Sequence, residues 1–240
     1  NTGVGMCALF SNTVGNNNTA LGTCTLKTMN SANNNVALGS QTMRELTTGG
    51  CNTGVGYATL VSNTEGECNV AVGCGALQSN TTADNSVAVG FRALCSNTTG
   101  ATNVAVGVNS LIANTTGPAN VAIGCDAMCK TTTGGENVAI GRSALCSNVS
   151  SAGNAGVGYN VLRKNTGANN TAVGAFSLEL NTSASCNTAV GFSSLCTNTT
   201  GDRLTAVGFC ALSANTTGVN STAMGWCALR ANTTAVGNTA

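Results

Sequence analysis

The sequence predicts an all-β fold, a parallel β-solenoid (β-roll) of about fourteen 17-residue coils, and three observations support this class. An apolar residue followed by glycine recurs every 17 residues, with one interval of 16 residues between Gly158 and Gly174. Two positions of the repeat are always apolar, and most repeats contain an Asn-Thr-Thr-Gly-like turn. A short fixed period is typical of stacked coils, so we expect residues 1–240 to form one continuous repeat domain. The recurring glycines are Gly5, Gly22, Gly39, Gly56, Gly73, Gly90, Gly107, Gly124, Gly141, Gly158, Gly174, Gly191, Gly208 and Gly225.

Each element of the coil follows from the repeat unit, which reads N-[TV]-A-[VIL]-G-x-x-A-L-x-x-N-T-T-G-x-x, as in residues 103–117. Positions 1 to 5, which end at the recurring glycine, alternate and are rich in β-branched residues, so they predict a short strand. The segment around the leucine at position 9 predicts a second short strand. Asn-Thr-Thr-Gly predicts a turn, because asparagine bonds to its own backbone and glycine accepts a positive φ. Glycine, asparagine and threonine disfavour a helix, and the two invariant apolar positions argue against disorder.

Stacking these coils turns each position of the unit into a ladder of like residues. Position 3 is always alanine or glycine, and strand alternation turns it away from position 4. It therefore predicts either a face on which something packs closely or a narrow interior corner. We expect one core ladder at position 4, a second at position 9 and an asparagine ladder at position 1. These ladders begin with Val4, Leu21, Leu38 and Val55, with Leu9, Leu26, Met43 and Leu60, and with Asn1, Asn18, Asn35, Asn52 and Asn69.

The composition restricts the classes of function. Charged residues make up 7% of the chain, the net charge is +1 and histidine is absent. No basic face for nucleic acid is predicted, and no apolar run reaches the roughly 18 residues of a membrane span. Low charge favours association between copies, so self-association into a homopolymer or homo-oligomer is expected. The chain begins at position 1 and stops at position 3 of the unit, which predicts a piece of a longer shaft or a subunit that stacks head to tail.

Thirteen cysteines favour an oxidising, extracellular or cell-surface location, with any secretion signal already removed. Four pairs of cysteines are one repeat apart, and residues on adjacent coils lie about 4.8 Å apart, within the Cα separation that a disulfide spans. Four coil-to-coil disulfides are therefore predicted. They join Cys7 to Cys24, Cys51 to Cys68, Cys129 to Cys146 and Cys210 to Cys227. Five cysteines remain, and Cys186 with Cys196 is an open fifth pairing; the others are Cys74, Cys95 and Cys125.

No catalytic, cofactor or metal site is predicted. Cysteine has no histidine or other base beside it in the sequence, and no Cys-x-x-Cys motif occurs. The three aspartates are not periodic, unlike those of calcium-binding β-rolls. We therefore expect a protein that is not an enzyme.

The turn creates a repeated Asn-x-Ser/Thr sequon, the acceptor motif for N-linked glycans. Either glycans form a stripe along one edge of the coils, or the repeat copies an unused motif. Further sequons begin at Asn17, Asn169 and Asn220. The eight candidates that share one position are Asn80, Asn97, Asn114, Asn148, Asn181, Asn198, Asn215 and Asn232.

Aromatic residues gather at position 6 of the unit. This position predicts either an exposed apolar stripe, which marks association, or a wedge beside the core. Its members are Tyr57, Phe91, Tyr159, Phe192, Phe209 and Trp226.

The segments Asn-Thr-Ala-Val-Gly at 187–191 and Asn-Val-Ala-Ile-Gly at 120–124 resemble the head repeats of YadA-type trimeric autotransporter adhesins. Similar Asn-Thr-Ala-Val-Gly and Ala-Leu repeats resemble those of phage tail-fibre shafts. The resemblance implies a parallel β-roll in an extracellular fibre or adhesin. The adhesin repeat is shorter and poor in cysteine, and no catalytic residue carries over.

Three hypotheses for function follow. The first is a secreted structural protein whose solenoid subunits stack or polymerise into an extracellular filament or surface fibre with covalent glycans. The second is an adhesin or tail-fibre binding module. The third is an ice-binding solenoid, because the threonines at 188, 205 and 222 form a regular ladder.

Overall fold

The computed structural model describes residues 1–240 and confirms the predicted all-β parallel β-solenoid. Each coil contributes one strand of three residues, and no helix is present. The chain forms two compact units, residues Asn1–Asn120 (unit 1) and Val121–Ala240 (unit 2), which are described separately. Unit 1 contains β1 (Thr2–Val4), β2 (Thr19–Leu21), β3 (Val36–Leu38), β4 (Thr53–Val55), β5 (Val70–Val72), β6 (Val87–Val89) and β7 (Val104–Val106). Unit 2 contains β8 (Val121–Ile123), β9 (Val138–Ile140), β10 (Ala155–Val157), β11 (Thr171–Val173), β12 (Thr188–Val190), β13 (Thr205–Val207) and β14 (Thr222–Met224).

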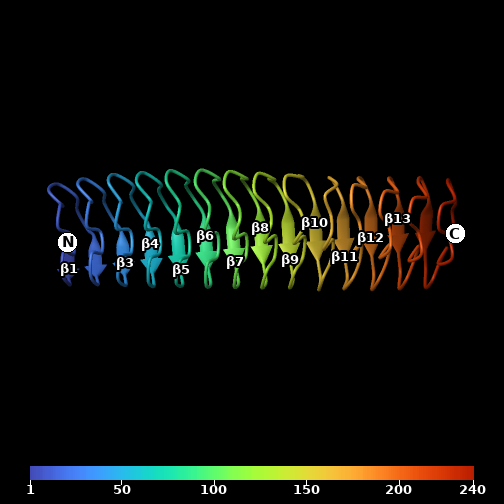
Figure 1. Ribbon diagram of the computed structural model, residues 1–240, viewed down its shortest axis with the longest axis horizontal. Coiled ribbons are helices and arrows are strands. Elements are labelled where there is room, and N and C mark those ends of the chain that lie inside the picture. Colours follow the sequence, from blue (N-terminus) through green and yellow to red (C-terminus); the bar gives the residue numbers. More distant parts are fainter. The chain divides into compact units, whose positions relative to one another are not determined.

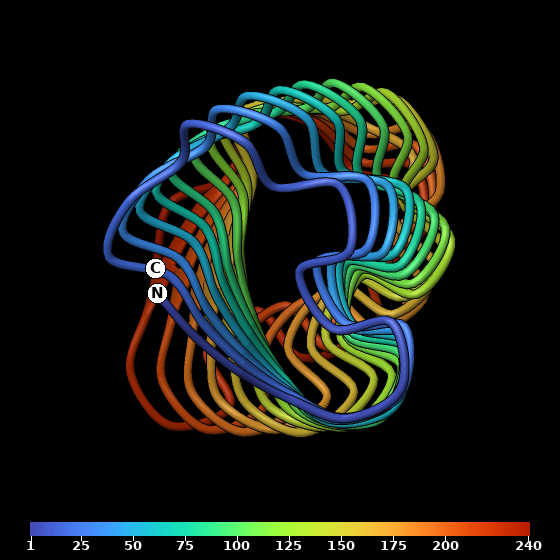
Figure 2. The ribbon, with the colours of Figure 1, turned by 90° about the vertical axis from the view of Figure 1, so that its left-hand side faces the viewer.

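Within each unit the strands pair in parallel and in chain order, one coil after the next (Figure 1). In unit 1 every residue pairs with the residue 17 positions later, as Ala71 does with Ala88. In unit 2 the partner of Ala155 is Thr171, 16 positions later. This coil is one residue shorter than the others, and the difference lies in its turn, so the strands keep their register. Figure 2 shows that successive coils within a unit repeat one outline.

The predicted second strand around position 9 is wrong. Positions 6 to 11 form turns instead, and the residues at positions 7 and 9 have positive φ, as do Cys24 (54°) and Leu26 (49°). Residues in this left-handed region curl the backbone, so it cannot form a second extended segment. The turn still bonds to the next coil, since Leu26 N donates to Thr42 O at 3.1 Å.

The core lies on the opposite side of the strand from the side predicted. The strand alternates as expected, but position 3 points inward and position 4 points outward, so Val4 and Leu21 are 56% and 50% exposed. The position-9 ladder is confirmed as core, with Leu26, Met43 and Leu60 fully buried. This ladder lies against position 3 and leaves room for little more than alanine or glycine. A Cβ atom added to Gly54 would lie 2.7 Å from Thr42 Cγ2 and 3.0 Å from Met43 Cε.

The recurring glycine forms the corner after each strand. Gly90 has a φ of 135°, a conformation that residues with a side chain rarely adopt. A Cβ atom added there would lie 2.6 Å from the carbonyl oxygen of Gly107 on the next coil. Backbone strain and close stacking therefore both require glycine, which explains why this position sets the period of the sequence.

Candidate functional surface

The outward side chains of the strands form one regular surface on each unit, which we call the strand face. It consists of positions 2 and 4 of every coil, and no member is charged. Unit 1 contributes Thr2, Val4, Thr19, Leu21, Val36, Leu38, Thr53, Val55, Val70, Val72, Val87, Val89, Val104 and Val106. Unit 2 contributes Val121, Ile123, Val138, Ile140, Ala155, Val157, Thr171, Val173, Thr188, Val190, Thr205, Val207, Thr222 and Met224.

The strand face is apolar and stiff. Its residues stand in straight columns because the parallel register never changes within a unit. Most of its members are β-branched, and such side chains have few rotamers. Contiguous exposed apolar surface on a protein marks a site of interaction. The sequence pattern predicts position 4 as core, so it does not predict the strand face.

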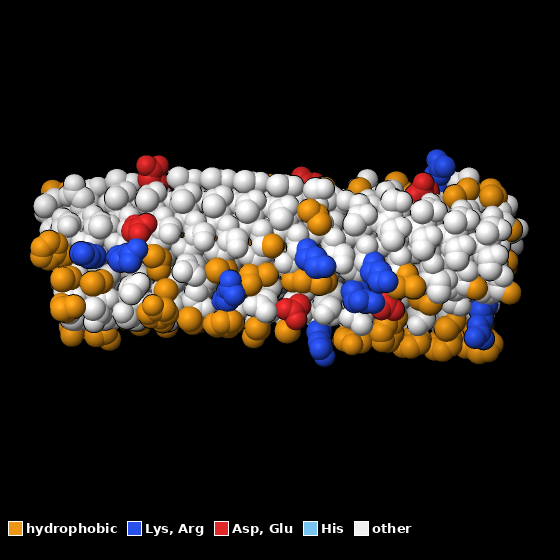
Figure 3. Space-filling model, in the orientation of Figure 1, with side chains coloured by type: hydrophobic (Ala, Val, Ile, Leu, Met, Phe, Trp, Pro, Cys, Tyr) orange, Lys and Arg blue, Asp and Glu red, His pale blue; other side chains and the backbone are white.

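A second exposed feature is an aromatic column on unit 2. Its rings come from five consecutive coils, with ring centroids 5.3, 5.7, 5.5 and 6.4 Å apart in chain order. The last three rings are stacked, and Trp226 is 77% exposed. The structure therefore favours the exposed stripe over the wedge, and Figure 3 shows hydrophobic side chains along one edge of unit 2. The column consists of Tyr159, Phe176, Phe192, Phe209 and Trp226.

Phe176 was not among the predicted aromatic residues because it stands at position 7 rather than position 6. Position 6 of its coil is Ala175, and the Phe176 ring lies between those of Tyr159 and Phe192. On unit 1, Tyr57 and Phe91 are exposed at position 6 of separate coils. They have no aromatic neighbours along their column there.

The repeated sequons lie inside the coil and not at its surface. Asn97 is fully buried, and its Nδ2 atom donates to Asn80 Oδ1 and to Gly100 O, both at 3.0 Å. A glycan is attached through Nδ2, so the folded coil has no room for one at this position. The same burial holds for Asn80, Asn97, Asn114, Asn148, Asn181, Asn198 and Asn215, whereas Asn232 is half-buried.

The sequence does contain a signal for this second asparagine ladder. Met29 and Leu46 occupy the same position of the repeat, and both are fully buried. An apolar residue that alternates with asparagine in one column indicates an interior position. The exposed sequons are those at Asn17, Asn169 and Asn220, at the turn that precedes a strand.

The predicted asparagine ladder at position 1 is confirmed within each unit. Asn52 is fully buried, and its Nδ2 atom donates to Asn35 Oδ1 at 3.2 Å and to Gly66 O at 2.8 Å. Its own Oδ1 atom accepts from the backbone N of Asn69 at 3.0 Å. Because each amide is satisfied, polar ladders can fill an interior that apolar residues fill elsewhere.

All thirteen cysteines are free thiols in the structure, so the four disulfides stay predictions. Cys129 and Cys146 are half-buried neighbours in one column. A hydrogen bond with the Cys129 thiol lowers the pKa of Cys146 to about 7, although burial opposes this shift. The same hydrogen bond, together with burial, raises the pKa of Cys129.

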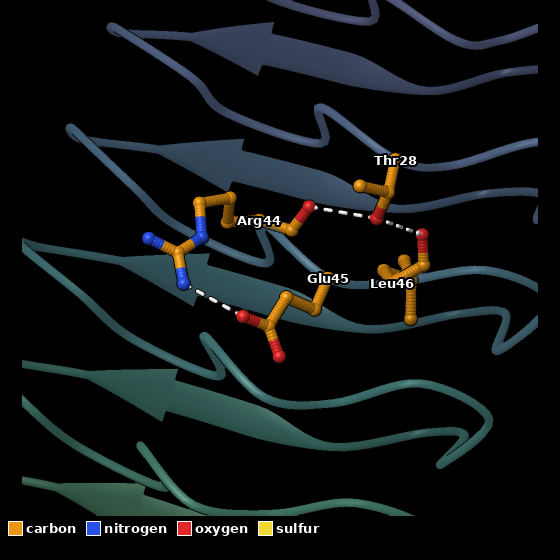
Figure 4. Close-up of polar contacts among 4 residues, drawn as sticks. All are labelled: Thr28, Arg44, Glu45 and Leu46. Carbon is orange, nitrogen blue, oxygen red and sulfur yellow. Dashed lines mark hydrogen bonds and ion pairs between the residues drawn. The ribbon is translucent and has the colours of Figure 1, made fainter.

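Two ion pairs join oppositely charged side chains. Arg44 Nη2 lies 2.6 Å from Glu45 Oε1 (Figure 4), and Arg163 Nη2 lies 3.0 Å from Glu179 Oε1 on the next coil. Thr28 Oγ1 lies 2.9 Å from Arg44 O and 3.3 Å from Leu46 O, which ties its coil to the next. These partly exposed ion pairs contribute little to stability.

No pocket was detected, and no cluster of His, Cys, Asp or Glu is arranged to hold a metal ion. The structure has no helix of the length and apolarity needed to cross a membrane. Comparison with protein-family models, with curated proteins and with solved structures gave no match.

Proposed function

We propose that the chain is a structural protein of the extracellular or cell-surface space, and that copies associate into a filament or fibre. The observation that supports this best is the uncharged strand face, whose outward residues are all apolar in β5 to β7 of unit 1 and in β8 to β10 of unit 2. Chains with an exposed apolar face of this kind bury it against another surface, because burial removes apolar area from water. A second copy offers the same flat, uncharged surface.

The interior supports a mechanical role. Asparagine amides and turn threonines repeat the same bonds from coil to coil, as when Thr81 Oγ1 donates to Thr98 O and Thr98 Oγ1 donates to Thr115 O, both at 3.0 Å. Within unit 1 these coils are therefore joined to their neighbours by backbone and side-chain bonds together. Repetition of this kind stabilises length and stiffness rather than one local site.

Glycans on such a fibre would be carried by the exposed sequons. Asn17, Asn169 and Asn220 are exposed, and each stands in a turn with a φ of 56 to 58°. A coat at these positions would add solubility to a chain with a net charge of +1.

Electron microscopy of the full chain tests the proposal. We expect filaments with a repeat near 4.8 Å, the spacing of paired strands. The double variant Val87→Lys, Val89→Lys places two charges on the strand face and should shift the protein to short, dispersed particles. The control Thr82→Lys, Thr99→Lys adds the same charge at exposed turn positions and should assemble like the unchanged chain.

Circular dichroism should show that both variants keep their β structure. Dispersed particles for the unchanged chain, or equal assembly of both variants, would contradict the proposal. Peptide mapping of the same filaments should find any glycan at the three exposed sequons and none in the buried column.

A further inference from the structure

The strand face changes in composition along unit 2. Its first coils present valine or alanine at position 2, whereas β11 to β14 present four threonines in succession. These threonines pair with one another in unbroken parallel register. We call this part the threonine array. It consists of Thr171, Thr188, Thr205 and Thr222 with the outward residues Val173, Val190, Val207 and Met224.

The hydroxyl groups of the array have no hydrogen-bond partner within the chain. The turn threonines of the same coils differ, since Thr182 Oγ1 donates to Thr199 O at 2.9 Å and Thr199 Oγ1 donates to Thr216 O at 3.0 Å. A hydroxyl left without a partner must bond to water or to whatever covers it. The array therefore offers unused donors and acceptors at a surface that is otherwise apolar.

The array is also a regular grid. Neighbouring coils lie about 4.8 Å apart, and the threonine and valine columns of one strand lie about 7 Å apart. The β-branched side chains have a restricted choice of χ1 rotamers. The alanines between the two columns, such as Ala189 and Ala206, are fully buried and fix the strands from below. Hydroxyl and methyl groups thus repeat in two directions on a rigid surface.

The absence of charge indicates a neutral partner. A second copy of the chain is a poor occupant, because burying these hydroxyls against an apolar face would leave them without hydrogen bonds. A small soluble ligand would need a concave site to cover it. A neutral, periodic solid with its own hydrogen-bond donors and acceptors can match a regular grid of this kind.

We propose that the threonine array binds ice. Water molecules held by the hydroxyls and packed between the methyl groups are fixed in a repeating pattern by the rigid strands. Such a layer can merge with the surface of an ice crystal, and a bound protein then limits growth of the crystal at that surface. This binding goes beyond the structural role, because it uses the coils of β11 to β14, where threonine hydroxyl groups stand beside the outward apolar residues.

Thermal hysteresis and the shape of growing ice crystals test the proposal with the full chain. We expect hysteresis and faceted crystals. The double variant Thr188→Lys, Thr205→Lys should lose both effects, because two charges interrupt the grid. The matched control Thr200→Lys, Thr217→Lys adds the same charge at exposed turn positions of the same two coils and should keep them.

A milder variant distinguishes disruption of the threonine array from unfolding of the protein. Thr188→Val, Thr205→Val keeps the shape and the strand propensity but removes two hydroxyls, so it should fold normally and show reduced hysteresis. Running the assay also on the Val87→Lys, Val89→Lys variant keeps the result independent of assembly. Absence of hysteresis in both backgrounds, or equal hysteresis in the array variant and its control, would overturn the proposal.

Discussion

At the scale of single residues, this fold depends on side chains that both donate and accept hydrogen bonds. The buried asparagine amide can donate to one coil while it accepts from another, as Asn198 does when its Nδ2 donates to Asn181 Oδ1 at 3.0 Å and its Oδ1 accepts from Asn215 Nδ2 at 2.9 Å. No apolar residue forms such a chain of bonds. Two amide oxygens of the column are buried without a partner: Asn148 Oδ1, next to the 16-residue coil, and Asn114 Oδ1, where the residue 17 positions later in the sequence is Thr131. The ladder therefore depends both on the period and on an asparagine at each step.

The thiol pair of unit 2 gives a prediction at the same scale. The pKa of Cys146 is lowered to about 7 by its hydrogen bond with Cys129, whose own pKa is raised. The thiolate is the reactive form, so in the reduced protein, where both cysteines are thiols, alkylation of Cys146 by iodoacetamide should rise as the pH passes 7 and level off near pH 8. Cys129 should stay largely unmodified over that range. Peptide mass spectrometry at a series of pH values measures both rates.

Removal of the hydrogen-bond partner provides the control. Cys129→Ala should move the rise in Cys146 alkylation to higher pH, because burial then acts without the opposing bond. Equal rates for the two cysteines, or no change in the variant, would show that the pair does not share a proton in this way. The coupled pair titrates as a unit, so the midpoint belongs to both thiols.

At the scale of the coil, the repeat period and the glycine corner could be predicted from the sequence, and so could the strand that precedes it. The side of the strand that faces the core could not be predicted. Alternation shows that Ala88 faces away from Val87 and Val89, but it does not show which side is inside. In the structure Ala88 and Leu94 are both fully buried, whereas Val89 is 36% exposed. The small residue of the strand therefore faces the core and the valines face outward, which alternation alone does not predict.

The glycine corner yields a prediction with an internal control. Gly90→Ala should lower the free energy of unfolding by at least about 2 kcal/mol, because the new Cβ would meet Gly107 O at 2.6 Å and φ is 135°. Gly75 also has a positive φ, of 69°, but the nearest atom to an added Cβ is 3.5 Å away. Asn109 and Asn160 occupy the equivalent position in other coils with φ of 55° and 52°.

Gly75→Asn should therefore change stability by no more than about 0.5 kcal/mol. Denaturant unfolding followed by circular dichroism compares the two variants. Equal losses would mean that any side chain disturbs the corner region, whereas no loss for Gly90→Ala would mean that the coils can separate enough to admit a methyl group.

At the scale of the whole molecule, the low charge has a clear physical meaning. The 240 residues include only nine basic and eight acidic residues, and none of these lies on the strand face. The sequence alone therefore indicated a chain that associates readily. It could not indicate the surface involved, because that required knowing which way position 4 points. The sequence shows the threonines at 188, 205 and 222 as a ladder. It does not show that their hydroxyl groups lack hydrogen-bond partners within the chain.

Association through an uncharged face should change little with salt concentration and should weaken on cooling. Added sodium chloride screens interactions between charges, and the Debye length falls from about 10 Å at 0.1 M to about 3 Å at 1 M. Since the strand face has no charges to screen, we expect filament mass measured by sedimentation to change little between these concentrations. Cooling should weaken assembly, because the hydrophobic contribution falls with temperature. Filaments that dissolve in salt and persist on cooling would instead place the contact at charged residues such as Lys164 and Arg203, away from the strand face.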